Sequence, residues 1–266
     1  MGAIRGFFLV IVSVLLFLSL FSFALFLTLT SSLDYNNLQN ESKIVIKEML
    51  KENMNINSVI DDAYPFIQIY CQNNSEYVLS FQDYTFAIPC NITTNGKEFI
   101  VDNGIDYLIK GIYYRDYGCQ FLDCFGKSEI PTFLFSIKSY TFLKNIFYTV
   151  FAISFLLILL VFFLVEKKTN LPLLLGGLMI VSSLPFLKIK SFIQLIPNES
   201  AIKIVGLFFS NSNLIAIQIL IAGIVLLIVG FILKLFKTGF SISNILSKFN
   251  KPENKSPKIA KNTKSK

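Results

Sequence analysis

The sequence predicts a mainly α-helical membrane protein: a bundle of four transmembrane helices with a mixed, mostly helical, disulfide-stapled extracytoplasmic domain between spans one and two. Three observations predict this class. Hydrophobic residues make up 53% of the 266-residue chain, four long runs contain no Asp, Glu, Lys or Arg, and all four cysteines fall in one loop. Discrete apolar runs of about 20 residues match the thickness of a bilayer, whereas a soluble domain distributes its apolar residues over shorter elements.

The four charge-free runs are the predicted spans. Each approaches the roughly 20 helical residues that cross about 30 Å of hydrocarbon. The first run, of 24 residues, is longer than the apolar core of a cleavable signal peptide, and no A-x-A-like cleavage site follows it, so we expect a retained anchor. The runs are Phe7–Thr30, Ile146–Val165, Leu171–Leu187 and Asn213–Leu233.

Basic residues near the span ends predict the orientation. Arg5 precedes the first span, Lys167 and Lys168 lie in the turn after the second, and a Lys-rich tail follows the fourth. The positive-inside rule assigns these segments to the cytoplasm, which predicts a cell-membrane protein with both termini inside. The predicted order is a cytoplasmic N-terminus at 1–6, spans at 7–30, 146–165, 171–187 and 213–236, a cytoplasmic turn at 166–170, outer segments at 31–145 and 188–212, and a cytoplasmic tail at 237–266.

The two outer segments differ in character. The large one carries 14 acidic and 9 basic residues, a net charge of −5, and is long enough for a small folded unit. The small one carries Lys188, Lys190 and Lys203, which oppose the orientation, but inverting the chain would export the basic tail. The apolar stretch 201–209 in the small segment is too short to cross a bilayer, so we expect an interfacial helix.

The four cysteines, Cys71, Cys90, Cys119 and Cys124, all lie in the large segment. An oxidising compartment favours structural disulfides there, and four cysteines allow three pairings, of which neighbour with neighbour is the simplest. If Cys119 pairs with Cys124, the chain between them must be a tight loop, because residues five apart in a helix are too distant for a disulfide. The spacings do not give the C-x2-C pairs typical of zinc or redox sites.

Helices and strands are both expected in the large segment. The first span continues outward as a helix to about Met54, because no Gly or Pro interrupts that stretch. A second helix begins near Asp102 or Asn103, either of which can cap it. Aromatic and β-branched residues at 77–81 and 85–88 predict two strands. The apolar face of the second helix comprises Val101, Ile105, Leu108 and Ile112.

Small residues recur every seven positions in the fourth run, at Ala216, Gly223 and Gly230. Small side chains let helices approach closely in a membrane, so this face predicts packing against another span or against a second copy of the chain. The tail from 248 to 266 contains seven Lys and one Glu and supplies +6 of the net charge of +7. Its membrane-surface candidates are Lys248, Lys251, Lys255, Lys258 and Lys261.

The tail has two alternative interpretations. The apolar residues just before it, from 242 to 249, have helical spacing and suit a short helix on the inner membrane surface, with the lysines attracted to anionic lipid. The other interpretation is a solvated, disordered tail. Because it has no interleaved aromatic residues, we expect no nucleic-acid partner.

The sequence contains few of the residues that catalysis or metal binding requires. The chain has no His, which excludes Ser/His and Cys/His nucleophile pairs, and no phosphate-binding glycine motif. The carboxylate pairs Asp61 with Asp62 and Asp116 with Asp123 are expected to be solvated, and the DNGID run lacks the other ligands of a calcium loop. We expect no cofactor and no metal. The predicted outer segments also contain four N-x-S/T glycosylation candidates, at Asn40, Asn73, Asn91 and Asn198.

The sequence therefore favours a non-enzymatic multi-pass membrane protein whose extracytoplasmic domain makes protein–protein contacts or assembles in the cell envelope. Its expected partners are the lipid bilayer and either another protein or a second copy. One alternative is a membrane oxidoreductase or transferase that uses the Cys119/Cys124 loop. The other is a passive channel lined by Ser residues and Gln218, although the charge-free spans do not favour ion transport.

Overall fold

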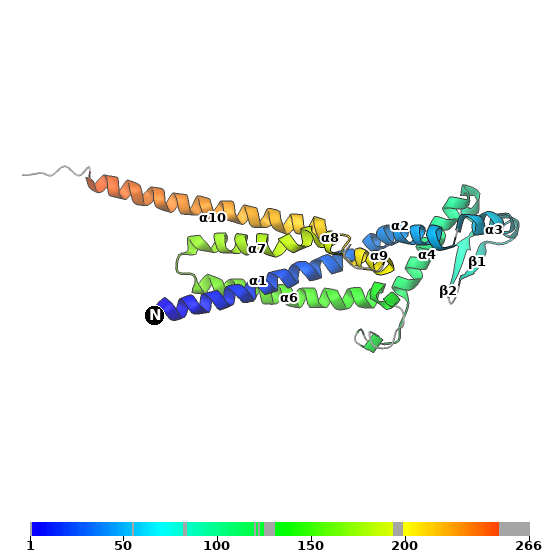
Figure 1. The fold of residues 1–266 in the computed structure, drawn as a ribbon, viewed down its shortest axis with the longest axis horizontal. Helices are drawn as coiled ribbons and strands as arrows, with labels where there is room; N and C mark the ends of the chain where they lie inside the picture. Colours follow the sequence, from blue (N-terminus) through cyan, green and yellow to red (C-terminus); the bar gives the residue numbers. More distant parts are fainter. Residues whose placement is uncertain are drawn as a thin grey trace, which may run out of the picture.

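The computed structural model describes residues 2–54, 56–81, 84–119, 121, 123–124, 131–193 and 199–249, which are mostly helical. Figure 1 shows four long helices side by side, with a smaller domain beyond one end of them. We call the four long helices the bundle and residues 33–136 the loop domain. The bundle helices are α1 (Gly2–Ser32), α6 (Ile137–Leu164), α7 (Leu171–Leu187) and α10 (Ser212–Phe249). The loop domain contains α2 (Tyr35–Met54), α3 (Ile56–Tyr70), β1 (Glu76–Phe81), β2 (Tyr84–Pro89), η1 (Cys90–Asn95), α4 (Lys97–Tyr114) and η2 (Pro131–Phe135). The shorter connections are η3 (Lys168–Asn170), α8 (Ile189–Ile193) and α9 (Glu199–Phe208).

Within the described residues, four helical segments are long and apolar enough to cross a membrane, which indicates a membrane protein. α7 coincides with the predicted third run, the first and fourth runs lie inside longer helices, and the second lies in α6 except for Val165, which follows the helix end. The helices extend past the runs because a charge-free run marks the hydrocarbon crossing, whereas a helix can continue once its side chains become polar. The four segments are Ile4–Ser32, Ile137–Leu164, Lys168–Leu187 and Ile204–Lys237.

The bundle consists of two helix pairs, α1 with α6 and α7 with α10. Leu16 and Val161 are fully buried where α1 meets α6, and the Ser19 and Ser154 hydroxyls share a hydrogen bond of 2.7 Å there. Phe186 of α7 lies in a second cluster that also contains side chains of α1 and α10. Since lipid tails are as apolar as these side chains, close packing and the serine hydrogen bond, rather than burial from water, hold the helices together.

Glycines bring the backbones of α7 and α10 into contact. A Cβ atom on Gly176 would lie 2.6 Å from the carbonyl oxygen of Gly223, and one on Gly230 would lie 2.7 Å from a side-chain carbon of Leu173. Ala216, the third member of the predicted small-residue face, is fully buried in the cluster that joins α1, α7 and α10. The small-residue face of α10 thus packs within the chain.

The end of the bundle opposite the loop domain carries the N-terminus and the α6–α7 turn (Figure 1). The Arg5 guanidinium donates hydrogen bonds of 2.8 and 3.1 Å to the carbonyl oxygens of Leu164 and Phe163, and its Nη1 lies 3.8 Å from Glu166. Lys168 donates to the Phe162 carbonyl oxygen. Carbonyls at a helix C-terminus lack partners within the helix, so these cations satisfy them and complement the helix dipole.

Two expectations about helix ends were wrong. The helix of the first span does not continue to Met54: it ends at Ser32, and α2 begins anew at Tyr35. The Asp34 carboxylate accepts a hydrogen bond of 3.2 Å from the Asn36 amide, which caps α2 and stabilises the break. Within the described residues, the apolar stretch 242–249 does not form a separate surface helix, because α10 runs unbroken to Phe249.

The loop domain confirms the predicted strands. β1 and β2 form an antiparallel hairpin in which Tyr77 pairs with Ile88 and Leu79 with Phe86. The prediction that Asp102 or Asn103 caps the second helix was wrong, because α4 begins five residues before Asp102. Its buried residues also differ from the predicted stripe and share only Ile105 with it. They are Ile100, Ile105, Ile109 and Tyr113.

Candidate functional site

The part of the loop domain farthest from the bundle is a small lobe, which we call the distal lobe and define as residues 56–100. α3 enters it, the hairpin and η1 follow, and α4 leaves it (Figure 1). Cys71 pairs with Cys90 at disulfide distance, with their Cα atoms 5.2 Å apart. Ile67 and Ile100 form a small buried core beside this link. The pair therefore connects the end of α3 to the end of the hairpin.

α3 is apolar on two faces, which distinguishes it from an ordinary surface helix. One face places Ile67 in the core of the distal lobe. The other exposes Phe66, Ile69 and Tyr70, whose exposed fractions are 72%, 64% and 46%. These three residues are three and four positions apart, so they lie side by side on the helix. We call Phe66, Ile69 and Tyr70 the apolar patch.

A charged cluster joins α2 to α4. The Lys43 ammonium group lies 2.9 Å from Asp106 and 3.9 Å from Asp102, and Lys47 also pairs with Asp102. These side chains are about one quarter to one third exposed, so water screens the attraction only in part. The cluster fixes the register of α2 against α4.

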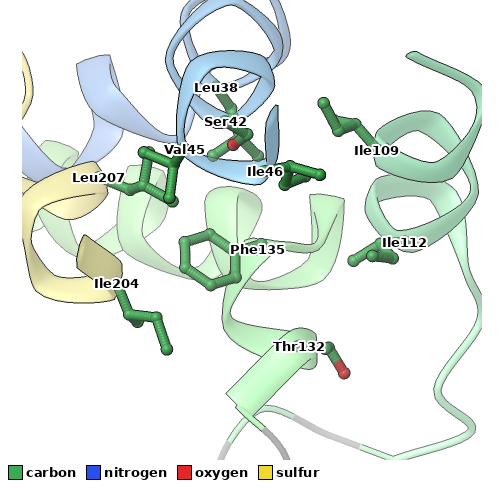
Figure 2. Close-up of a pocket in the computed structure, with 10 residues that line it drawn as sticks. All are labelled: Leu38, Ser42, Val45, Ile46, Ile109, Ile112, Thr132, Phe135, Ile204 and Leu207. Atoms are coloured by element: carbon green, nitrogen blue, oxygen red, sulfur yellow. The ribbon is translucent and has the colours of Figure 1, made fainter. Parts of the chain in front are cut away.

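An apolar cavity of about 240 Å³ lies one turn closer to the bundle, between the same two helices, η2 and α9. Figure 2 shows its side chains converging from these four elements, with the Phe135 ring among them. Phe135 also stacks on Phe208 with the ring centroids 4.9 Å apart. The residues that line the cavity are Leu38, Ser42, Val45, Ile46, Ile109, Ile112, Thr132, Phe135, Ile204 and Leu207.

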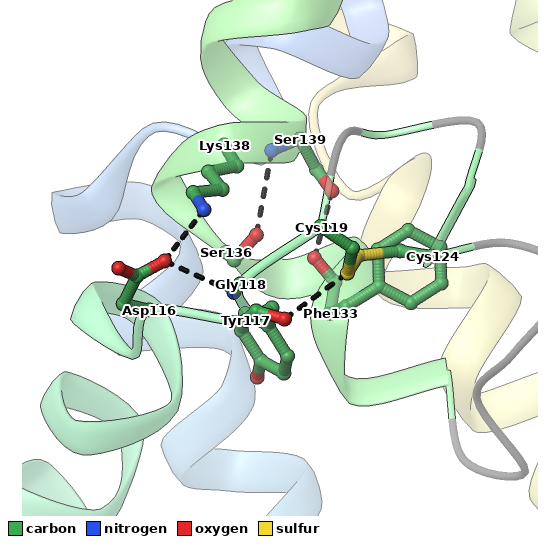
Figure 3. The surroundings of a disulfide bond; sticks show 9 residues. All are labelled: Asp116, Tyr117, Gly118, Cys119, Cys124, Phe133, Ser136, Lys138 and Ser139. Carbon is green, nitrogen blue, oxygen red and sulfur yellow. Dashed lines mark hydrogen bonds and ion pairs between the residues drawn. A yellow bond between two sulfur atoms is a disulfide. The ribbon is translucent and has the colours of Figure 1, made fainter.

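The second cysteine pair closes a tight loop beside the start of α6 (Figure 3). Cys119 lies at disulfide distance from Cys124, with their Cα atoms 5.6 Å apart. The Asp116 carboxylate accepts hydrogen bonds of 2.6 Å from Lys138 and 3.1 Å from the Gly118 amide. Gly118 has φ of 61°, a conformation that glycine adopts without strain. These contacts anchor the loop to α6.

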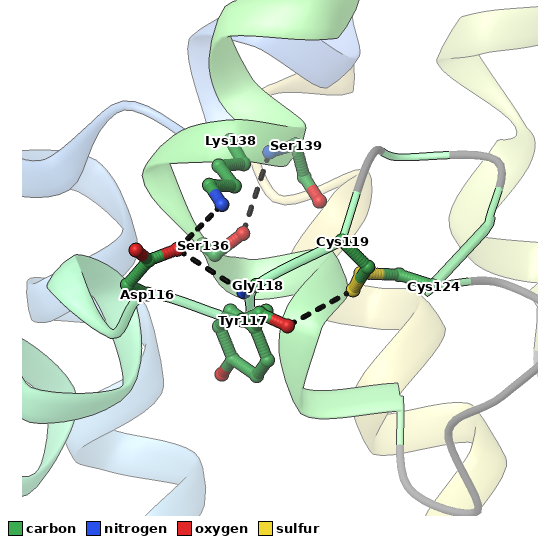
Figure 4. Close-up of polar contacts among 8 residues, drawn as sticks. All are labelled: Asp116, Tyr117, Gly118, Cys119, Cys124, Ser136, Lys138 and Ser139. Atoms are coloured by element: carbon green, nitrogen blue, oxygen red, sulfur yellow. Dashed lines mark hydrogen bonds and ion pairs between the residues drawn. A yellow bond between two sulfur atoms is a disulfide. The ribbon is translucent and has the colours of Figure 1, made fainter.

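The two sulfur atoms of this loop differ in access. Cys124 is 4% exposed, whereas Cys119 lines an open groove of about 600 Å³ together with Phe121, Phe142 and Asn145. Figure 4 shows Cys119 Sγ directed at the carbonyl oxygen of Tyr117, 3.1 Å away. A thiol-bearing substrate would therefore reach Cys119 first.

Three groups in the loop domain have shifted pKa values: Tyr35, whose pKa burial raises, Tyr113 and Asp116. Burial, reinforced by the nearby Asp34 carboxylate, raises the pKa of Tyr113 well above its ordinary value, so its phenol stays protonated. The hydrogen bond from Lys138, with that from the Gly118 amide, lowers the pKa of Asp116. Because the folded pKa of Asp116 is lowered, its stabilising effect is present above the ordinary value near 3.8 and is lost as the pH falls through the folded value.

Acidification is therefore expected to loosen the Cys119–Cys124 loop before the distal lobe. When the pH falls from 5 toward 2, the rate at which a phosphine reduces Cys119–Cys124 should rise relative to the rate for Cys71–Cys90. D116N should show the ratio of the acidified wild type at every pH, because its amide cannot form the ion pair with Lys138. D123N, which removes another carboxylate of the same loop, should behave as wild type. Mass spectrometry of alkylated peptides measures both rates, and a pH-independent ratio in the wild type would contradict the role of Asp116.

Other predicted site residues are dispersed. Asn40, Asn73 and Asn91 are exposed in the loop domain, as a modification would require, and Asn198 lies outside the described residues. Lys248 is in α10, whereas Lys251, Lys255, Lys258 and Lys261 lie outside the described residues.

The carboxylates Asp61, Asp62, Asp116 and Asp123 are exposed, in agreement with the expectation that they are solvated. Asp61 binds Lys97 at 2.5 Å and Asp116 binds Lys138, so each is held by a cation from another element. Among the described residues, no three or more His, Cys, Asp or Glu side chains are placed to hold a metal ion. This arrangement provides apolar contact surfaces and anchored loops.

Comparison of the chain with protein-family models, curated proteins and solved structures finds no match. The candidate site is therefore argued from the loop domain alone. The sequence patterns did not predict the Lys43–Asp106 cluster or the cavity. A sequence signal for the cluster exists: Lys43 with Lys47, and Asp102 with Asp106, are complementary pairs at helical spacing of four. The cavity has no such signal, because four separate elements line it.

Proposed function

We propose that the protein is a non-enzymatic multi-pass protein of the cell membrane whose loop domain faces outward and makes protein–protein contacts in the cell envelope. The observation that carries this proposal is the apolar patch of α3, at the end of the molecule farthest from the bundle. Contiguous exposed apolar side chains mark interaction surfaces, because covering them removes them from water. The Cys71–Cys90 pair keeps α3 in place, so the patch is presented with little loss of conformational entropy on binding.

The charge distribution supports the outward orientation. Arg5 and Lys168 bind the same helix end, and Lys167 lies in the same turn, so these cations share the end of the bundle opposite the loop domain. The positive-inside rule places such an end in the cytoplasm. The two cysteine pairs favour the oxidising side of the membrane for the loop domain.

The two alternative functions have less support. Thiol–disulfide exchange would require a substrate thiolate to attack Cys119 and release Cys124 as a thiolate, and Cys124 is only 4% exposed, so burial disfavours the negative charge that it would carry. For a channel, Ser19 and Ser154 bond to each other, and Gln218 is exposed on the outer side of α10. These polar side chains do not line a common path through the bundle.

Photo-crosslinking tests the proposed contact. With benzoylphenylalanine in place of Ile69 in the full chain, cells that naturally make the protein should give one dominant adduct. The same group in place of Tyr107, an exposed aromatic residue of α4, should give little of it. The adduct mass distinguishes a second copy from another protein.

Protease added to intact cells should digest the adduct and spare the Lys-rich tail, whereas loss of the tail with survival of the adduct would contradict the orientation.

Matched substitutions test whether the apolar patch supplies the affinity. F66S should weaken the contact more than about fivefold, because a central aromatic contact is commonly worth more than about 1 kcal/mol. F99S, which removes an exposed Phe of α4, should leave the adduct yield unchanged. Equal yields from F66S, F99S and wild type would refute the patch as the contact surface.

A further inference from the structure

We propose that the cavity between α2, α4, η2 and α9 binds one acyl chain of a bilayer phospholipid. The inference is independent of the protein contact proposed above, because it concerns the opposite end of the loop domain. Its starting point is the lining, in which eight of ten side chains are aliphatic or aromatic and two, Ser42 and Thr132, carry hydroxyl groups.

The lining selects an apolar occupant over water. A water molecule held in a protein needs two to four polar partners, and this cavity offers two hydroxyls among its ten side chains. A volume of about 240 Å³ is several times the roughly 30 Å³ that one water molecule occupies in the liquid. A chain of methylene groups can contact the whole lining and gain the dispersion attraction that an empty space forfeits.

The position of the cavity identifies the bilayer as the source of the chain. Ile204 and Leu207 lie within the fourth apolar segment, which begins at Ile204, and Phe135 precedes the second segment by two residues. Leu38 follows the end of the first segment by six residues, just past the break between α1 and α2. The cavity therefore adjoins the headgroup region on one side of a bilayer. A lipid chain can therefore reach the cavity without leaving its leaflet.

The cavity has a charged neighbour and an apolar one. Lys43 of α2 pairs with Asp106 of α4, next to Ser42 in sequence and one turn before Ile109. Phe135 stacks on Phe208 of α9, which lies in the fourth apolar segment. The apolar lining is therefore continuous with the apolar segments of the bundle.

Photolabelling of the full chain in phosphatidylcholine vesicles tests this site. The probe is phosphatidylcholine with a diazirine near the end of one acyl chain, and mass spectrometry of peptides locates the adducts. Wild type should be labelled at 38–46 or 109–112 as well as in the bundle helices, which serve as the internal reference. Adducts confined to the bundle helices would overturn the proposal.

A matched pair of substitutions on α2 separates cavity binding from surface contact with lipid. I46W fills the cavity and should lower loop-domain labelling more than about tenfold, because each excluded methylene weakens apolar binding about fourfold. I44W adds the same indole two residues away, where the side chain is 58% exposed, and should not lower it. I112W, from the facing helix, should repeat the effect of I46W, and equal labelling in I44W, I46W and I112W would overturn the site. Retention of both cysteine pairs on non-reducing analysis checks that each variant is folded.

Discussion

Replacing Cys71 and Cys90 together by Ser is expected to raise the rate of proteolysis within the distal lobe about a hundredfold. The pair joins residues 19 positions apart, and closing a loop of that size stabilises the folded state by about 3 kcal/mol. Among the described residues, the buried cluster of the lobe contains only Ile67 and Ile100, with a few partly buried side chains packed against them, so the core is small compared with that loss. Since cutting follows the population of the open form, 3 kcal/mol corresponds to roughly two orders of magnitude. Native-state proteolysis of the full chain in detergent, with mass spectrometry of the first fragments, measures the rate.

The second cysteine pair provides the matched control. Replacing Cys119 and Cys124 by Ser opens a loop with a separation of only five residues, worth about 2 kcal/mol, and its new cleavage sites should cluster near 115–136. Cleavage between 56 and 100 should stay slow in this variant. If the Cys71/Cys90 variant is cut no faster than wild type in the distal lobe, packing alone holds that lobe together.

Replacing Gly176 by Ala is expected to destabilise the bundle by about 1–3 kcal/mol, the usual cost of overpacking. The added methyl group would meet the carbonyl oxygen of Gly223 at 2.6 Å and the amide nitrogen of Leu227 at 2.9 Å. Both are backbone atoms, so no side chain can move aside and α7 must separate from α10. Titration of the folded protein in mild detergent with sodium dodecyl sulfate measures the change as a lower midpoint.

Gly177 is the control, because it is the adjacent glycine of the same helix and a methyl group there would have nothing within 4 Å. Without a clash, Gly to Ala in a helix stabilises by about 0.5–1 kcal/mol, because Ala loses less backbone entropy on folding. The two variants should therefore shift the midpoint in opposite directions. A higher midpoint for G176A would show that the two helices are not held at backbone contact.

The bundle was predictable because hydropathy and helix breaks agree there. α7 matches its predicted run at both ends, with Pro172 in its first turn and the charged residue Lys188 just beyond its last. The end of α10 was not predictable in this way, because apolarity reports the membrane crossing and the helix continues beyond it to Phe249. The break at Asp34 was also missed, since a side-chain cap can stop a helix in a stretch with no Gly or Pro.

The candidate site was predictable only where its determinants are local. The aromatic and β-branched residues of the hairpin predicted two strands, and the simplest cysteine pairing agrees with the structure. By contrast, Asp102 was interpreted as a cap because its partners Lys43 and Lys47 lie more than 50 residues earlier in the chain. The apolar patch was missed because the spacing of apolar residues predicts which side of a helix is apolar, but not whether a neighbouring element covers that side.

The Cys71–Cys90 pair also determines how the distal lobe would carry mechanical load. α3 ends at Tyr70 and α4 begins at Lys97, so the covalent link spans the hairpin between them. Tension applied to α3 by a bound partner passes from one cysteine to the other and on into α4, while the hydrogen bonds between the strands bear almost none of it. The hairpin is mechanically bypassed, and the lobe can resist pulling until a helix unwinds.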